Sequence, residues 1–364
     1  MSESNLSCVL YGPGNVRYEN RPTPKIEDKH DALIRIAYVG VCGSDVHFWA
    51  HGGVSRMVTE DEPIVMGHEA SGIVHSIGSG VTHLKVGDRV AIEPGFNCRR
   101  CKQCKAGRYN ICPQMHFAAD PPGNHGTLSR LFKIPADFVY PIPDLLSLQE
   151  AVLVEPLAVA VHSVRLAKLV PGQSVLVQGS GAIGLLTAAV AKTYGARTVI
   201  VSDVKEEKLK FAGNYITRCT PFQVDLRSTP QQESQRLMAL PNVQDGVDVA
   251  FECSGVESSA QTGLLALAPG GTFVQVGLGK PDQTLPLLAM CEKEVTLKTA
   301  FRYGPGDYEI ALSLLGTGNV TVIPLISSIV PFKKAHVAWE KTKQGKGIKN
   351  LIQGIADEPS SDTD

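Results

Sequence analysis

The stretch Ser174-Val-Leu-Val-Gln-Gly-Ser-Gly-Ala-Ile-Gly184 decides the fold of the central part of this chain. It opens with an apolar run that has the length of a buried strand, and residues 181–194 are small and apolar at helical spacing. Glycines at positions 179, 181 and 184 permit a tight turn, close approach of the backbone to a pyrophosphate, and close packing of helix on strand. The stretch therefore predicts a strand, a turn and a helix whose N-terminus binds a dinucleotide phosphate.

Asp203 supports this interpretation, because it ends the next predicted strand about 20 residues after the glycines. A carboxylate at that place accepts hydrogen bonds from the ribose 2′-OH of NAD and repels the 2′-phosphate of NADP. Lys208, one turn into the following helix, is counted with the cofactor contacts, although a solvated lysine is the simpler interpretation. The alternative for the whole motif is a helix start packed for structural reasons, with Asp203 merely turning the chain. NAD is the predicted cofactor.

Strand and helix patterns continue to alternate after the glycine motif. Apolar runs at residues 198–202, 247–251, 271–276 and 296–299 are separated by helical segments. Alternation of this kind is typical of a parallel, doubly wound sheet, which we expect over residues 158–298.

The first part of the chain has a different pattern. Glycine and proline break it into short apolar stretches such as 32–40, 72–77 and 86–92, which predicts a β-rich, barrel-like domain over residues 1–157. Residues 299–364 return to irregular pieces and are expected to rejoin that domain. A chain of 364 residues is long enough for two domains. The predicted fold class is therefore α/β, with one β-rich and one doubly wound domain.

Four cysteines, Cys98, Cys101, Cys104 and Cys112, gather in a lobe at about residues 95–115. Four thiolates suit a closed tetrahedral zinc site, which makes the ion structural. An iron–sulfur cluster is the main alternative, because Pro113 follows the last cysteine as in bacterial ferredoxins, but the last spacing is too long for one. Disulfides would need an oxidising compartment, and unrelated thiols would not cluster. Zinc is the favoured interpretation.

The composition is that of an average soluble protein, with 43% hydrophobic residues, 20% charged residues and a net charge of −1. This balance gives no reason to expect nucleic acid or an anionic membrane as a partner. The basic residues between the cysteines are interpreted as a solvent-exposed surface. Binding of nucleic acid by these residues is the alternative interpretation. The opening residues are polar rather than a signal segment, so a cytoplasmic location is expected. The acidic, serine-rich end from about residue 356 is expected to be a disordered tail.

A second polar constellation is formed by Cys42, His68, Glu69 and Glu155. Singly, Cys42 is best interpreted as a buried thiol and His68 as a satisfied core histidine. Together with the carboxylates they offer the mixture of sulfur, nitrogen and oxygen ligands of an open zinc site.

These motifs give the chain a family resemblance. The segments 40–47, 67–69, 86–94, 301–303 and 345–349 resemble the zinc-dependent medium-chain dehydrogenase/reductase family, in its polyol dehydrogenase branch, and the likeness runs nearly end to end. The chain is most similar to fungal xylitol, sorbitol and L-arabinitol dehydrogenases. The resemblance implies a GroES-like catalytic domain, a Rossmann coenzyme domain, NAD, one catalytic and one structural zinc per subunit, and a homotetramer.

The resemblance also assigns roles to single residues. It implies that Cys42, His68 and Glu69 hold the catalytic zinc, with Glu155 binding it directly or through its water. Ser44, a Glu155-bound water and, less directly, His47 are expected to relay the proton. A local turn residue is an equal alternative for Ser44, and a satisfied buried ring is the favoured alternative for His47.

The remaining contacts fall into two groups. The expected cofactor contacts are Gly179, Gly181, Ile183, Gly184, Asp203, Lys208, Val276, Gly277, Leu278, Phe301 and Arg302. The expected substrate contacts are Phe48, Glu155, Arg302 and Tyr303.

The function that the resemblance implies is the NAD-dependent oxidation of a sugar alcohol to its ketose. Xylitol, sorbitol, L-arabinitol and galactitol are the substrates considered. Family alcohol dehydrogenases carry a cysteine where this chain has Glu155, and that difference favours a polyol. Phe48 stands where animal sorbitol dehydrogenases have tyrosine. The alternatives are a threonine- or diol-type zinc dehydrogenase, or a non-catalytic protein that binds NAD and zinc.

Overall fold

The computed structural model describes residues 4–53 and 56–355 and divides the chain into two compact units. Unit 1 contains the residues up to Glu155 and those from Thr321 onward, and unit 2 runs from Pro156 to Val320. The expected disordered tail from about residue 356 lies outside the described residues.

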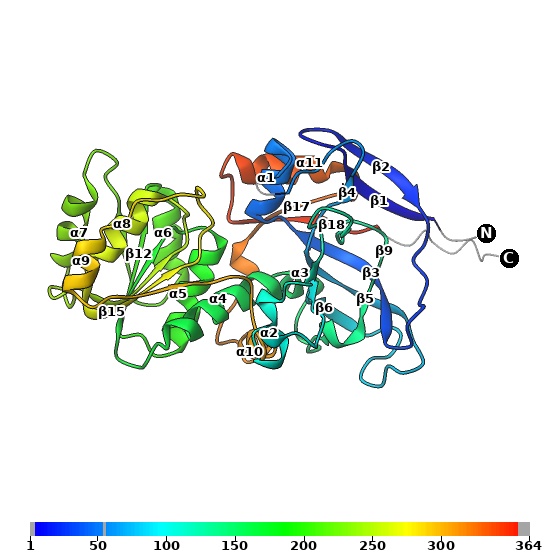
Figure 1. The fold of residues 1–364 in the computed structure, drawn as a ribbon, viewed down its shortest axis with the longest axis horizontal. Coiled ribbons are helices and arrows are strands. Elements are labelled where there is room, and N and C mark those ends of the chain that lie inside the picture. Colours follow the sequence, from blue (N-terminus) through cyan, green and yellow to red (C-terminus); the bar gives the residue numbers. More distant parts are fainter. Residues whose placement is uncertain (1–3, 54–55, 356–364) are drawn as a thin grey trace. The chain divides into compact units, whose positions relative to one another are not determined.

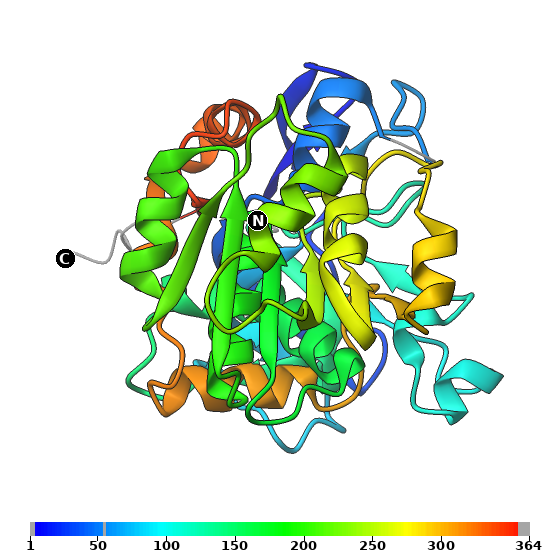
Figure 2. The ribbon, with the colours of Figure 1, turned by 90° about the vertical axis from the view of Figure 1, so that its left-hand side faces the viewer.

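Unit 2 is a six-stranded parallel sheet in the order β13-β12-β11-β14-β15-β16 (Figures 1 and 2). Numbered within the unit, this is the 3-2-1-4-5-6 order of a doubly wound dinucleotide-binding sheet. Helix α5 packs on β11 and β12, and helix α8 packs on β14 and β15. The predicted Rossmann fold of this part of the chain is confirmed.

The predicted strands at 174–178 and 296–299 match residue for residue, those at 198–202 and 247–251 are one residue longer, β15 begins earlier than predicted, and β13 was not predicted. The elements of unit 2 are β11 (Ser174–Gln178), α5 (Ala182–Thr193), β12 (Thr198–Asp203), α6 (Glu206–Tyr215), β13 (Cys219–Gln223), α7 (Pro230–Met238), β14 (Val247–Glu252), α8 (Glu257–Ala266), β15 (Leu267–Gln275), α9 (Leu287–Glu292), β16 (Thr296–Thr299) and α10 (Asp307–Gly316). Helix α4 (Val154–Ala167) begins at the end of unit 1 and continues into unit 2.

The chain returns to unit 1 at Thr321 rather than at residue 299, where the sequence pattern placed the return. The physical reason is α10, which is tied to α4 of unit 2. Asp307, at the start of α10, is fully buried and forms ion pairs with Arg165 and with His162, whose Nδ1 lies 2.8 Å away. A buried carboxylate held in this way fixes its helix to its partners.

Unit 1 is built mainly from antiparallel strands, as predicted for a GroES-like domain. Its seven-stranded sheet has the order β10-β6-β5-β3-β18-β17, with β9 also pairing with β3. The C-terminal strand β18, drawn in red, lies beside the N-terminal strand β3, drawn in blue (Figure 1). A three-stranded sheet, β2-β1-β4, and the pair β7-β8 complete the strands of the unit in the described residues.

The elements of unit 1 are short. They are β1 (Asn5–Leu10), β2 (Val16–Arg21), β3 (Asp31–Gly40), α1 (Gly43–His51), β4 (Ile64–Val65), β5 (Glu69–Ile77), β6 (Arg89–Ile92), β7 (Gly95–Phe96), α2 (Lys102–Lys105), β8 (His116–Phe117), β9 (Leu131–Pro135), β10 (Val139–Pro141), α3 (Leu148–Val152), β17 (Ile326–Val330), α11 (Ala335–Lys343) and β18 (Lys349–Gln353). In the described residues, 3-10 turns lie at Tyr109–Ile111, Ala136–Phe138, Ile323–Leu325 and Phe332–Lys334.

Each unit has its own apolar core. In unit 1 the buried side chains come from β1, β3, β5, β6 and α11, and they include Ile34, Ile36 and Trp339. In unit 2 the core lies between the sheet and its helices. Across the part of the chain that the structure describes, every helix is too short or too polar to cross a bilayer.

Candidate active site and zinc centres

Cys42, His68 and Glu69 come together in unit 1, with one ligand atom of each within 4.8 Å of the others. Cys42 is the N-cap of α1 and lies two residues after the end of β3, whereas Glu69 is the first residue of β5. These two strands pair antiparallel with Gly40 opposite Glu69, so the end of one strand meets the beginning of the other. A Cβ on Gly40 would lie 2.1 Å from Oε2 of Glu69, which explains the glycine at that position.

Asp45 is a buried carboxylate next to this group, and it was not among the predicted site residues. It is buried and closes a capping box at the start of α1, where the Cys42 N–H donates to its Oδ2 at 2.9 Å. Its other oxygen lies 3.6 Å from Nδ1 of His68. A carboxylate on the Nδ1 side leaves Nε2 of the ring available to a metal, as is common behind zinc-bound histidines. The sequence feature that could have identified Asp45 is its position three residues after the N-cap Cys42, where an acidic side chain can close a capping box.

Lys349 is a second residue without a predicted role. Its Nζ lies 2.7 Å from both carboxylate oxygens of Glu69 and donates to the Val41 carbonyl at 3.2 Å. Burial alone would lower the pKa of Lys349, but the Glu69 carboxylate outweighs it, so the pKa is raised and the ammonium stays charged. Lys349 lies on β18, which reaches the site by pairing with β3.

The electrostatics of the site suit a divalent cation. Burial would lower the pKa of His68, yet the Asp45 carboxylate and the Cys42 thiol raise it to about 10, with a further contribution from Glu155. Glu155 is 6% exposed and lies in the first turn of α4; it is near enough to act electrostatically on His68 and Lys349, but the structure does not group it with the three possible ligands. One thiolate, one imidazole and nearby carboxylates form the donor set of an open zinc site.

The four cysteines form a second centre. Their sulfurs all lie within 4.8 Å of one another, with separations of 3.4 Å for Cys101–Cys104, 3.8 Å for Cys101–Cys112 and 3.9 Å for Cys98–Cys104. A tetrahedral site with Zn–S bonds of about 2.3 Å separates its sulfurs by roughly 3.8 Å, so the cluster fits zinc. Backbone N–H groups of Arg100 and Cys101 lower the pKa of Cys98 to about 6, which favours the thiolate.

The glycine motif in unit 2 has the geometry of a dinucleotide-binding turn. Gly179 has a φ of 89°, which an L side chain rarely adopts. A Cβ at Gly184 would lie 1.8 Å from the Gly179 carbonyl oxygen, so helix α5 can pack this closely only with glycine there. At Gly181, the N-cap of α5, an added Cβ would meet nothing within 4 Å. The open space therefore lies at the helix N-terminus, where an anion binds. Ile183 is in the first turn of the same helix.

Asp203 ends β12 and is hydrogen-bonded to this turn. Its Oδ2 accepts from the N–H and the hydroxyl of Ser180, at 2.8 and 2.7 Å, and its Oδ1 accepts from the Lys205 N–H at 2.9 Å. Burial would raise the pKa of Asp203, but these donors outweigh it and lower the pKa, so a carboxylate is maintained. Lys208 is half-buried and contributes to the same shift.

A cavity of about 490 Å³ opens next to Asp203, at the carboxyl ends of β12 and β13. Its volume is in the range of ligand pockets. Its lining residues are Val204, Gln223, Val224, Asp225, Leu226, Arg227 and Arg236.

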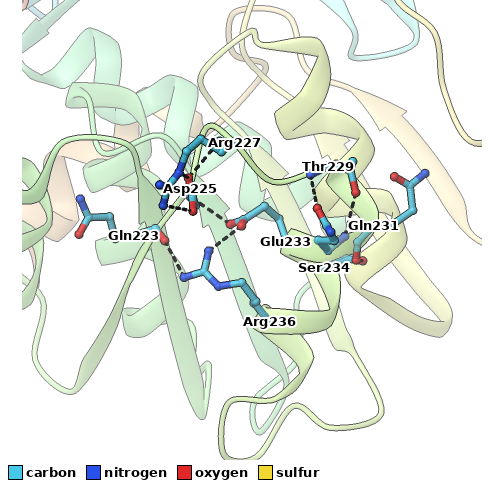
Figure 3. A network of polar contacts seen from close by, with 9 residues as sticks. Gln223, Asp225, Arg227, Thr229, Gln231, Glu233, Ser234 and Arg236 are labelled. Carbon is cyan, nitrogen blue, oxygen red and sulfur yellow. Dashed lines mark hydrogen bonds and ion pairs between the residues drawn. The ribbon is translucent and has the colours of Figure 1, made fainter.

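A polar network fixes the wall of this cavity (Figure 3). Arg227 donates to both oxygens of Asp225, at 3.0 and 2.9 Å, and lowers the pKa of that carboxyl to about 2. Arg236 donates to the buried Glu233 at 2.5 Å and to the Gln223 carbonyl at 3.3 Å. The loop after β13 is thus held by charged side chains from α7 and from the loop itself.

The other predicted contacts have diverse environments. Ser44 and Phe48 are half-buried on α1, whereas His47 is exposed, so the favoured alternative of a satisfied buried ring is wrong for His47. Its ring is 6.1 Å from that of His51, one turn along the solvent face of the helix.

In unit 2, Val276 and Gly277 follow β15 and are half-buried, and Leu278 is exposed. Phe301 is exposed, and the Arg302 guanidinium lies over its ring at 4.7 Å. Tyr303 is buried, with its ring edge-on to Tyr308 at 4.9 Å. These placements leave the predicted cofactor and substrate roles as predictions.

The chain was compared with known proteins. Residues 28–144 match the alcohol dehydrogenase GroES-like domain family, and residues 182–317 match the zinc-binding dehydrogenase family. The chain is 49% identical over 355 residues to a probable D-xylulose reductase A of Neosartorya fischeri, covering 97% of this chain and 98% of the relative. It is 48% identical over 351 residues to D-xylulose reductase A of Aspergillus niger, covering 96% of this chain and 97% of the relative.

Among solved structures, L-idonate 5-dehydrogenase from Escherichia coli superposes with a TM-score of 0.87 at 28% identity, covering 97% of this chain and 99% of that one. The likeness extends over both units, and the chain covers nearly the full length of each of these relatives. With its two cysteine-containing metal centres and its glycine turn, the chain belongs to the zinc-dependent medium-chain dehydrogenases, as the sequence motifs predicted.

Proposed function

We propose that this protein oxidises a sugar alcohol to the corresponding ketose, with NAD as the hydride acceptor. The observation that carries the proposal is the group of Cys42, His68 and Glu69, with Glu155 near enough to act electrostatically on His68. The curated relatives at 48% and 49% identity are named D-xylulose reductases, so xylitol and D-xylulose are the first substrate pair to examine.

The residues of the site have separable tasks in this reaction. Cys42, His68 and Glu69 would hold a zinc ion, which would supply a Lewis acid for the substrate hydroxyl. Asp45 faces Nδ1 of His68 at 3.6 Å and so leaves Nε2 for the metal, and Lys349 balances the charge of Glu69. Glu155 and Ser44 are the groups proposed to accept and pass on the hydroxyl proton.

The cofactor is proposed to bind along the carboxyl edge of the sheet in unit 2. The pyrophosphate would lie at the N-terminus of α5, over the open space at Gly181. The ribose would meet Asp203, and the cavity next to that residue would take the adenine end. The cytoplasmic location and the tetramer remain predictions.

A substrate panel with the purified protein tests the proposal. Xylitol, sorbitol, L-arabinitol and galactitol should be turned over with NAD, and metal analysis should find one zinc in each of the two centres. Faster turnover of butanediol or threonine than of any polyol would replace the polyol proposal with a diol- or threonine-type activity. Zinc confined to the four cysteines, with no turnover of any alcohol, would favour a non-catalytic protein.

Replacing Asp203 with asparagine should weaken the preference for NAD over NADP by about tenfold or more, because a charge repulsion of roughly 1.4 kcal/mol or more disappears. The asparagine retains an oxygen that can accept from Ser180 or Lys205, so the glycine turn should be disturbed less than by alanine. The measurement is the ratio of kcat/KM for the two cofactors. An unaltered ratio would place the discrimination elsewhere.

A further inference from the structure

We infer that Glu252 is a positioning residue for the cofactor: its buried carboxylate fixes the two turns that follow β14 and β15 at the edge of the dinucleotide crevice. The inference rests on the proposed NAD-dependent function and goes beyond it. Glu252 was not among the predicted site residues, and it ends strand β14.

The place of Glu252 in the sheet is the first argument. Strands β11 and β14 are neighbours, and the strand order reverses between them. In open sheets of this kind a ligand binds outside the carboxyl ends of the strands at the point of reversal. The glycine turn after β11 forms one wall of that crevice, and the turn after Glu252 forms the other.

The second argument is the number of hydrogen bonds that converge on one carboxylate. Oε1 of Glu252 accepts from the Ser254 N–H at 2.8 Å and from the Ser254 hydroxyl. Oε2 accepts from the Gly255 N–H and from Nε2 of Gln275, both at 2.8 Å. The residue is 0% exposed. A carboxylate is the side chain that can accept four such bonds without donating any.

The same residue also holds the turn after β15. Its main-chain carbonyl accepts from the N–H groups of Val276 and Gly277, both at 2.8 Å. Nε2 of Gln275, which donates to the carboxylate, donates as well to the Gly277 carbonyl at 2.8 Å. Val276 and Gly277 are expected cofactor contacts, so Glu252 sets the position of the backbone that would meet the cofactor.

The turns are packed too closely to move independently. A Cβ on Gly277 would lie 2.3 Å from the Gly255 nitrogen, and a Cβ on Gly255 would lie 2.8 Å from the Leu278 carbonyl oxygen. On the other side, a Cβ on Gly179 would lie 3.1 Å from the Cβ of Ser254. A displacement of the turn after β14 would therefore reach both the turn after β15 and the first glycine of the phosphate-binding motif.

Glu252→Gln changes the charge and one acceptor atom but not the shape. The amide nitrogen cannot accept, and it would point its hydrogens at an N–H of Ser254 or Gly255. The turns should then relax to relieve donor–donor contact, since a buried donor without an acceptor costs free energy. The expected result is a dissociation constant for NADH raised about tenfold or more, equivalent to roughly 1.4 kcal/mol.

Asp248 provides the matched control, because it lies on the same strand at the opposite, amino end. Its Oδ2 accepts from the N–H and the hydroxyl of Ser174, both at 2.7 Å, across neighbouring strands. Asp248→Asn makes the same chemical change far along the strand from the crevice edge. It should leave NADH affinity at the wild-type value and lower the midpoint of urea unfolding less than Glu252→Gln, because one oxygen of Asp248 accepts both bonds and the amide of asparagine can keep that oxygen in place.

The experiment is calorimetric titration of each zinc-loaded protein with NADH, combined with hydrogen exchange of the amides at 253–256 and 276–279. Weaker binding and faster exchange in Glu252→Gln, but not in Asp248→Asn, would support the inference. If Glu252→Gln does not fold, Gln275→Met is measured in its place. This variant removes the hydrogen bond from Nε2 of Gln275 to Oε2 of Glu252, and it should also weaken NADH binding.

Wild-type NADH affinity in Glu252→Gln, or in Gln275→Met where that variant is the one measured, would overturn the positioning role. An equal loss of affinity in Asp248→Asn would also overturn it, because the effect would then be one of general stability. Failure of the unaltered protein to bind NADH is a separate result. It would remove the proposed function, and the inference with it.

Discussion

Glu155→Ala is expected to lower turnover of the polyol by about 10²- to 10⁴-fold, the range associated with a positioned proton acceptor. The carboxylate is 6% exposed and close enough to His68 to raise its pKa, so it belongs to the electrostatic environment of the predicted zinc site. NADH affinity should remain unchanged, because the glycine turn in unit 2 is untouched. The measurements are kcat and KM for the polyol, zinc content, and the dissociation constant for NADH.

Glu150→Ala is the control for this variant. Glu150 lies five positions earlier and closes a capping box with Ser147, to which its Oε2 is bound at 2.7 and 2.8 Å. Its loss should reduce stability by about 1 kcal/mol, as for other helix caps, without changing kcat. Turnover by Glu155→Ala at the rate of Glu150→Ala would show that Glu155 has no part in the reaction.

Lys349→Met is expected to lower the free energy of unfolding by about 3–5 kcal/mol, because it leaves the Glu69 carboxylate buried without its cation. The two side chains are 4% and 1% exposed and their atoms are 2.7 Å apart. Adding Glu69→Gln to Lys349→Met should restore much of the loss, since the unpaired charge is then removed as well. Urea unfolding in the presence of a zinc chelator measures both changes, because a zinc ion bound to Glu69 would take the place of the ammonium.

Lys133→Met is the comparison for an exposed pair. Lys133 lies 3.4 Å from Glu27, which is 81% exposed, and such pairs contribute about 0.2–1 kcal/mol. A loss in Lys349→Met no greater than that in Lys133→Met would mean that Glu69 is neutralised by something other than the lysine.

Much of the fold follows from local pattern. The strand at 174–178 and the helix after it could be predicted because an apolar run, three glycines and a helical repeat are consecutive in the chain. The four-cysteine site could be predicted for the same reason, because its residues lie close together in the sequence. The return to unit 1 at Thr321 could not be predicted in this way, because α10 is held in unit 2 by an ion pair between the buried Asp307 and the partly exposed Arg165, which no periodicity indicates.

The residues that support the predicted ligands could not be predicted from the sequence either. Cys42, His68 and Glu69 were found through the family resemblance, and the structure brings them together. Lys349 is 280 positions from Glu69, and only the pairing of β18 with β3 makes them neighbours. Glu252 looks in the sequence like an ordinary strand end, because its hydrogen-bond partners belong to turns whose paths the sequence does not specify.

The insertion of β18 beside β3 has a consequence for the order of folding during synthesis. Unit 2 is one continuous segment, Pro156–Val320, so all its strands have left the ribosome before the last part of unit 1 is translated. The seven-stranded sheet cannot form completely until Lys349–Gln353 have been synthesised. Until then the Glu69 carboxylate lacks its partner, the ammonium group of Lys349. The nascent chain thus contains every strand of the nucleotide-binding sheet before Lys349 is added to balance the charge of Glu69.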